Sequence, residues 1–263
     1  NASALIKYKD NNIIITEDKN NYLKDLAIKL KAEVFEHKNY VGGRYSVLSE
    51  VGMLPAELMK LNENRFKQFN NLIVNKIFIK NLVNNVAATL NFIKTGKSNS
   101  IILNYDEQSE SLFKWYQQLI AESLGKKSKG ILPVISSMPK DNHSLMQLYL
   151  DGPKNAFYTF FNVLDNNDIK VNNKNILNSK NFLKNKSVEQ IKQSQMLATE
   201  KIFRIKKIPF RSFKILKRNE KTIGELFCFF ILETILLGRA LDVNPFDQPS
   251  VELIKQETKK ILI

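Results

Sequence analysis

Glu122 is a carboxylate in the last turn of a predicted helix, where an anion is poorly placed. The apolar residues Leu112, Tyr116 and Leu119 recur at helical spacing, and Gly125 ends the pattern. A helix C-terminus carries partial negative charge, which disfavours an anion by about 0.3–1 kcal/mol. That placement increases the proton affinity of the carboxylate and suits a general base at neutral pH. A solvated surface glutamate is the alternative interpretation.

A glycine pair precedes an arginine in the stretch VGGRYS, residues 41–46. Gly42 and Gly43 let the backbone approach a ligand closely. Arg44 offers a rigid, permanently charged fork for an oxyanion. The stretch therefore indicates an anion-binding loop, or else a turn with a surface arginine.

The chain has two histidines, and only one lies in a suggestive place. His143, in DNHSLMQ, is predicted in the first turn of a helix that Asp141 caps. The positive end of that helix favours a neutral imidazole that exchanges protons, although a polar first-turn residue is the simpler interpretation. His37, in FEHKN, belongs to no recognisable catalytic pattern.

Lys255 falls within the predicted apolar stripe of the last helix. At 100° per residue it lies between Val251 and Leu262. Lysines are rarely buried without a partner, so Lys255 either snorkels to solvent or extends into a site.

Alternating strand and helix patterns predict an α/β fold with a mostly parallel sheet. Ligands of such sheets are expected beyond the carboxyl ends of the strands. The segment 222–241 is apolar on nearly every side and is expected to be buried, whereas 165–181 is predicted to be a loop or insertion. Strands are predicted at 12–16, 100–105, 130–135, 155–163 and 208–216, and helices at 19–32, 55–94 with a break near Asn62, 109–123, 143–150, 187–203, 222–241 and 249–262.

Composition restricts the classes of partner. A single cysteine, Cys228, fits a reducing cytoplasm, and the longest apolar run, 226–232, is too short to span a membrane. The formal net charge of +14 calls for an acidic partner. The basic stretch 204–218 is the best candidate for nucleic acid, but its alternation also suits a strand, and an anionic small substrate explains the charge equally well. The sequence shows no metal-ligand cluster, and we expect no metal, nucleic-acid or membrane partner.

Four motifs together resemble the phosphoglucose isomerase (glucose-6-phosphate isomerase) family. They occur in the family's order, and the resemblance covers residues 13–259. The motifs are VGGRYSVLSEVGMLP, WYQQLIAESLGKK, DNHSLMQLYLDGP and NPFDQPSVELIK. The resemblance implies a sugar-isomerase (SIS) fold, in which helices flank a flavodoxin-like parallel sheet. It also implies interconversion of glucose 6-phosphate and fructose 6-phosphate without metal or organic cofactor.

The resemblance also implies roles for single residues. Glu122 matches the base that moves a proton between C2 and C1, and Arg44 matches the guanidinium that stabilises the enediolate. His143 and Lys255 match groups that assist ring opening, with the histidine supplied by the neighbouring subunit of a homodimer. Three further residues match positions that line the same site: Gln118 and Gln248 by their side chains, and Gly43 by its backbone.

The chain departs from the family in length. The family has two SIS domains, and the first carries the loops that hold the substrate phosphate. Nothing in this chain resembles those loops. We therefore interpret residues 1–60 as the tail of the first domain and 61–263 as the second domain with a C-terminal helix. A non-catalytic SIS module that binds a sugar phosphate or a partner is the alternative function.

Overall fold

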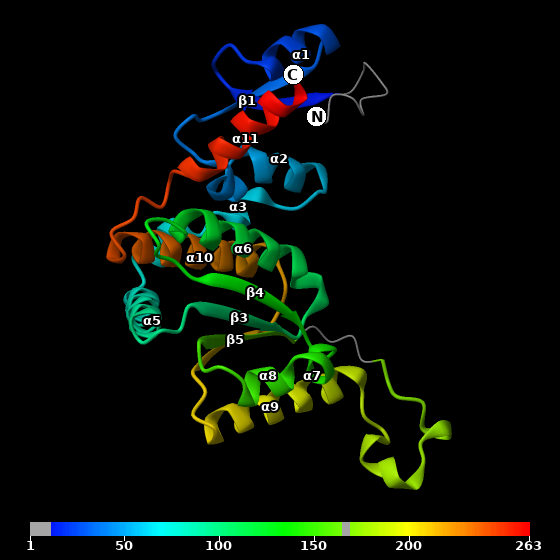
Figure 1. The fold of residues 1–263 in the computed structure, drawn as a ribbon. Helices are drawn as coiled ribbons and strands as arrows, with labels where there is room; N and C mark the ends of the chain where they lie inside the picture. The colour runs from blue at the N-terminus through cyan, green and yellow to red at the C-terminus, as the bar shows by residue number, and fades with distance from the viewer. Residues whose placement is uncertain (1–11, 165–168) are drawn as a thin grey trace.

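The computed structural model describes residues 12–164 and 169–263. Within them lies a parallel sheet of four strands, in the order β4-β3-β5-β6 (Figure 1). Its strands are β3 (Asn99–Asn104), β4 (Leu132–Ser137), β5 (Ala156–Val163) and β6 (Phe210–Ile215). The predicted α/β fold with a parallel sheet is confirmed.

Helices cover both faces of this sheet (Figure 1). On one face α5 (Lys76–Lys94), α6 (Glu110–Leu124) and α10 (Glu220–Ala240) enclose the larger apolar core. On the other face α8 (Met146–Asp151) and α9 (Val188–Ile205) enclose a second core. Successive residues of β5 alternate between the two cores, because side chains of a strand point to opposite faces in turn.

The long helix α10 passes close to the backbone of α3 (Glu63–Phe66). A Cβ on Gly224 would lie 2.2 Å from the carbonyl oxygen of Phe66, so only glycine permits this approach. The predicted burial of this helix holds for its central residues, including Cys228, Phe230 and Thr234.

A smaller unit precedes the main sheet. Strands β1 (Ile13–Glu17) and β2 (Glu33–His37) pair in parallel and are joined by α1 (Tyr22–Leu30). β2 was not predicted from the sequence, because its residues EVFEH carry three ionisable side chains and give no apolar run. The chain then passes through η2 (Gly43–Leu48) and α2 (Glu50–Leu58).

Several predicted helices are shorter than expected. The region 55–94 also breaks around α4 (Phe69–Ile73), and the predicted helix 143–150 divides into α7 (Asp141–Ser144) and α8.

The polar segment 165–181 contains short 3-10 helices instead of longer elements. The first is η4 (Asn173–Asn175), and the second, η5 (Asn178–Leu183), begins within the segment; residues 165–168 lie outside the described part. A third short 3-10 helix, η3 (Glu107–Ser109), precedes α6.

The last helix, α11 (Pro249–Leu262), is exposed along its whole length. Its apolar stripe therefore meets no counter-surface among the described residues. Among those residues, no helix combines the length and apolar character that crossing a membrane requires.

Candidate functional site

Arg44 is the centre of a polar cluster that joins three distant parts of the chain. Its side chain is buried, with the residue only 3% exposed. Nε donates to Ser123 Oγ at 2.8 Å, and Nη2 donates to the carbonyl oxygens of Pro245 at 2.7 Å and Asp247 at 3.1 Å. Nη1 donates to Glu122 Oε2 at 3.2 Å and to Gln248 Oε1 at 2.7 Å. These five contacts match the five N–H donors of a guanidinium.

Glu122 is the acidic member of the cluster. Gln118, one turn earlier on α6, donates from Nε2 to Glu122 Oε1 at 2.9 Å, while Arg44 holds the other carboxylate oxygen. These two contacts fix the orientation of the carboxylate. Because the side chain of Glu122 remains 31% exposed, this oriented base is still open to solvent.

The end of α6 is fastened to the turn before α11. Gly125 ends the helix where a Cβ would lie 2.7 Å from the carbonyl oxygen of Ala121. Lys126 then pairs with Asp247 at 2.7 Å and donates to the Asn244 carbonyl. The hydrogen bond from Lys126 lowers the pKa of Asp247. These contacts bring Gln248 to Arg44 from 204 positions away in sequence.

The cluster lies near the amino ends of the strands, not beyond their carboxyl ends as expected. The helix α6 returns the chain from the end of β3 to the start of the parallel neighbour β4, so its C-terminal turn lies near the amino ends of the strands. The hydrogen bond from Gln117 Nε2 to the Pro133 carbonyl, 2.7 Å long, supports this placement. The expectation of a site beyond the carboxyl ends of the strands is therefore wrong for this cluster, because Glu122 is placed by the end of a helix.

His143 and Lys255 lie outside the cluster. His143 is exposed in the four-residue α7, just after the carboxyl end of β4. The predicted cap is wrong, because Asp141 accepts from Ser136 Oγ and Ser137 N, both at 2.8 Å, and so fastens α7 to β4. Of the two alternatives for Lys255, exposure to solvent is the one observed: its side chain is 66% exposed and pairs with Glu252 at 2.6 Å.

Three cluster residues were not identified from the sequence. Ser123 Oγ also contacts Tyr45 Oη at 2.9 Å, and that hydroxyl donates to the Pro245 carbonyl at 3.0 Å. Burial raises the pKa of the Tyr45 phenol, so it remains a neutral donor. Trp115, the single tryptophan, donates from its indole to the Arg44 carbonyl at 2.9 Å. Ser123 continues the helical spacing of Leu112, Tyr116 and Leu119, which marks it only as a residue on the buried face of the helix, and no local pattern indicated the other two contacts.

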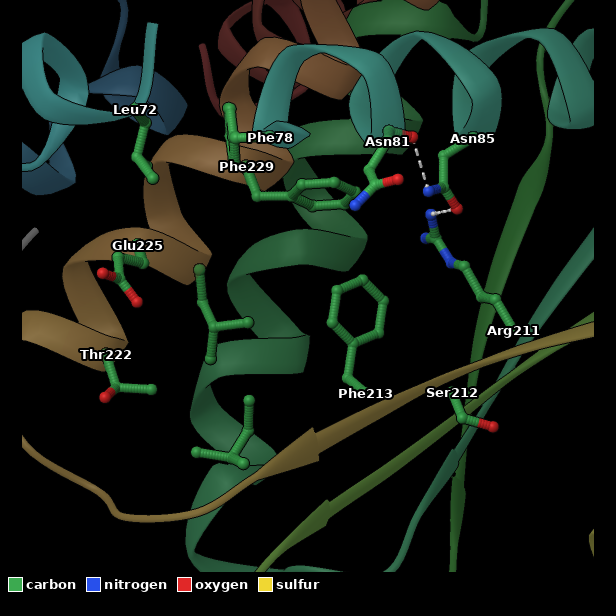
Figure 2. A pocket seen from close by; sticks show the side chains of 12 residues that line it. Leu72, Phe78, Asn81, Asn85, Arg211, Ser212, Phe213, Thr222, Glu225 and Phe229 are labelled. Carbon is green, nitrogen blue, oxygen red and sulfur yellow. Dashed lines mark hydrogen bonds between the residues drawn. The ribbon is translucent and has the colours of Figure 1, made fainter. Parts of the chain in front are cut away.

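A separate cavity of about 380 Å³ lies between α5, β6 and α10 (Figure 2). Arg211 lies at its side and contacts Asn85 at 3.4 Å. The same guanidinium forms a buried ion pair with Glu233, so its charge is compensated within the core. Arg218 likewise pairs with Asp106 at 2.8 Å. The two arginines of the basic stretch 204–218 that lie in or after β6 are thus engaged within the fold.

Among residues 12–164 and 169–263, no group of three or more His, Cys, Asp or Glu side chains is arranged to hold a metal ion. The cluster around Arg44 instead offers one base, one fixed cation and two amides. Those groups suit proton transfer next to a developing oxyanion.

Comparison with known proteins identifies relatives of this chain. The family model described as phosphoglucose isomerase matches residues 9–263. A probable glucose-6-phosphate isomerase of Methanococcus maripaludis is 33% identical over 228 residues, covering 84% of this chain and 51% of that protein. The glucose-6-phosphate isomerase of Mycoplasma capricolum is 31% identical over 267 residues, covering 98% of this chain and 62% of that protein. The chain therefore spans half to three fifths of the length of these relatives.

Solved structures share the fold. A hypothetical protein from Thermus thermophilus superposes with a TM-score of 0.84 at 24% identity, over 95% of this chain and 62% of that one. A glucose-6-phosphate isomerase from Chlamydia trachomatis superposes with a TM-score of 0.70 at 17% identity, over 95% of this chain and 52% of that one.

Proposed function

Since the chain belongs to the phosphoglucose isomerase family, we propose that it supplies the proton-transfer half of a glucose-6-phosphate isomerase. The observation that carries the proposal is the contact between Arg44 and Glu122, at 3.2 Å, with Gln118 on the other carboxylate oxygen. A base and a fixed cation held side by side are what aldose–ketose isomerisation requires. The substrate is a sugar phosphate, and the reaction needs no metal or organic cofactor.

The chemistry follows from the positions of these groups. Glu122 removes the proton from C2 of the open-chain aldose, and the electron pair moves to O1, giving a cis-enediolate. Glu122 then returns its proton to C1, and a second proton moves from O2 to O1, which completes the ketose. The positive charge of Arg44 stabilises the enediolate more than the neutral carbonyl, so it lowers the barrier.

Substrate binding requires an exchange of partners at Arg44, because all five of its donors are engaged. The amide oxygen of Gln248 is neutral, whereas the enediolate is charged and forms the stronger hydrogen bond with Nη1. Gln248 then lines the sugar instead. A Cβ on Gly43 would meet no atom within 4 Å, so the open space beside Gly43 leaves room for a backbone contact with the sugar.

Ring opening is assigned to His143 and Lys255. His143 lies at the carboxyl ends of the strands and Glu122 near their amino ends. His143 therefore serves the site of a neighbouring subunit in a homodimer. Lys255 reaches the sugar when α11 packs against a surface that the described residues do not provide. In this arrangement residues 1–60 are the tail of a first SIS domain and 61–263 form the second; residues 1–11 lie outside the described part.

The test adds the portion of a relative that this chain does not match. The chain is combined with the part of the Mycoplasma capricolum relative that it does not cover, and fructose 6-phosphate isomerisation is followed through a glucose 6-phosphate dehydrogenase. We expect turnover, and we expect Glu122→Gln to lower kcat by about 10²–10⁴-fold. Glu110→Gln, an exposed glutamate of the same helix, is the control and should retain full activity.

Two results would refute the assignment. Near-normal turnover of Glu122→Gln would show that another group is the base. Saturable binding of glucose 6-phosphate without turnover, in a combined preparation shown by sedimentation to be assembled, would indicate a non-catalytic sugar-phosphate module.

A further inference from the structure

His37 links the small N-terminal sheet to the segment that carries Arg44. It is the last residue of β2, and its imidazole is only 14% exposed. Nε2 lies 2.8 Å from the carbonyl oxygen of Val41, three residues before Arg44. Nδ1 contacts the carboxylate of Glu50, the first residue of α2. One side chain thus holds both flanks of the stretch 41–50.

The two partners of His37 define its protonation state. A backbone carbonyl and an ionised carboxylate only accept hydrogen bonds, so both imidazole nitrogens must donate. Only the imidazolium carries two N–H groups. A neutral imidazole has one N–H group, so it leaves the acceptor of either Val41 or Glu50 without a hydrogen-bond donor.

The charges around His37 agree with the imidazolium. Glu50 faces it from α2 and Glu17 from β1, whereas its neighbours on the chain, Glu36 and Lys38, pair with each other at 2.9 Å. The hydrogen bond with Glu50 raises the pKa of His37, opposed by burial and helped by the Val41 carbonyl. Burial alone would raise the pKa of Glu50, but the hydrogen bond and the charge of His37, together with hydrogen bonds from the Glu50 backbone and from Ser49, lower it.

The position of the Arg44 guanidinium depends on His37 through the short segment 41–44, which is held by hydrogen bonds at both ends. Val41 is held by His37 at one end. At the other end the Arg44 carbonyl accepts from the Trp115 indole, and Ser46 Oγ donates to the Gly43 carbonyl at 2.7 Å. Gly42 and Gly43 between these contacts have no side chains, so only such external contacts restrict their backbone.

We propose that His37 is a positioning residue, which as an imidazolium between Val41 and Glu50 holds the 41–44 segment so that Arg44 lies against Glu122. The importance for catalysis rests on the proposed function; the coupling of His37 to the Arg44 segment does not.

The coupling has a defined pH window. The pKa of His37 is raised in the folded chain. Its contribution to holding the segment 41–50 is therefore complete below the ordinary pKa of 6.5 and is lost as pH rises through the folded pKa. Because the folded pKa of Glu50 is lowered, its contribution is complete above the ordinary value of 4.5 and is lost as pH falls through the folded value. The segment is therefore held most firmly between pH 4.5 and 6.5 and loosens as pH rises through the folded pKa of His37.

The test uses the isolated chain and two reporters that it already contains. The imidazole carbon-bound protons of the two histidines are followed by NMR against pH, with His143→Asn to assign them. Fluorescence of Trp115, the single tryptophan, is followed in the same samples and reports on the Arg44 carbonyl. We expect His37 to titrate above pH 6.5, and the Trp115 fluorescence to change with the same midpoint.

Variants separate positioning from local pairing. Glu50→Gln should lower both midpoints together, and His37→Gln should abolish the fluorescence transition. Glu36→Gln, which removes an exposed carboxylate next to His37, should leave both midpoints in place. A flat Trp115 response across the His37 titration, or a transition that persists in His37→Gln, would overturn the proposal.

Kinetics supply an independent measurement in the combined preparation. His37→Gln should lower kcat by about 10-fold with little change in KM, because misplaced Arg44 loses contact with the enediolate rather than with the bound sugar. Glu50→Gln should move the alkaline limb of the kcat–pH profile to lower pH. An unchanged profile would refute the catalytic importance of His37, while the spectroscopic result would still decide its coupling to the segment.

Discussion

Arg44 stabilises the fold through its hydrogen bonds, and under the proposed function it also stabilises a reaction intermediate. A buried guanidinium is tolerated only when its donors are paired, and here every one is used. The acceptors are equally dependent on it, since the Pro245 and Asp247 carbonyls face Nη2. Substitution of Arg44 is thus expected to affect stability as well as turnover.

Replacement by lysine tests this double role. Arg44→Lys keeps the charge but provides three donors on a compact ammonium, so at least two acceptors lose their partner. We expect the free energy of unfolding, measured by urea denaturation, to fall by about 2–4 kcal/mol. Arg65→Lys is the control, because Arg65 is exposed and makes one ion pair at 3.6 Å; its effect should stay within about 0.5 kcal/mol. Equal stability of the two variants would contradict the role assigned to Arg44 in the fold.

The sequence indicated some members of the cluster and not others, for physical reasons. Glu122 could be singled out because its charge opposes the helix dipole within one turn. The resemblance to the family added Gln118 and Gln248. The contact of Trp115 with Arg44 spans 71 positions and leaves no periodic signal, so only the three-dimensional structure reveals it.

Elements with strong apolar periodicity were predicted well, and elements placed by tertiary contacts were not. β3 and β5 are buried on both faces, and their apolar runs identified them. β2 has no such run and exists through its pairing with β1. The predicted helix 143–150 breaks at Leu145, because Asp141 directs α7 towards β4 instead of capping a longer helix.

The last helix has an apolar stripe that its sequence pattern predicted, but this stripe is exposed to solvent. In α11, Ile254 is 70% exposed and Ile261 is 83% exposed, so its apolar stripe lies in solvent. The alternative in which Lys255 extends into a site requires a further surface that packs against the helix. Without one, the stability of α11 depends on a single isolated stretch of 14 residues.

Hydrogen exchange should show this difference directly. Isolated helices of this length are marginal in water, so α11 amides are expected to exchange at least about 100-fold faster than amides at the centre of α10. The comparison is internal to one sample and can be read by mass spectrometry. Addition of the complementary portion of a relative should slow the exchange of α11 and leave α10 unchanged. Protection of α11 in the isolated chain equal to that of α10 would show that it is already packed, for example against a second copy.

At the scale of the whole molecule, attraction and positioning of the substrate are separate. The net charge of +14 creates a positive field that attracts anions, including the proposed sugar-phosphate dianion. Such a field is screened beyond about 8–10 Å at physiological salt and does not orient a ligand. Orientation requires donors at fixed positions, and at Arg44 these are already engaged.

The isolated chain of 263 residues is therefore expected to show little or no isomerase activity. Proton abstraction requires C1 and C2 of the sugar within about 3–3.5 Å of Glu122, and binding of remote parts of the substrate provides much of that positioning. The phosphate is the largest such part, and the motifs of this chain include none that resembles the family's phosphate loops. We expect isothermal calorimetry to show weak, salt-sensitive binding of glucose 6-phosphate, and the coupled assay to show activity only after the complementary portion is added. Robust turnover by the isolated chain would mean that residues outside the Arg44 cluster hold the phosphate. A survey of lysine-to-methionine variants, beginning with Lys255, would then locate them.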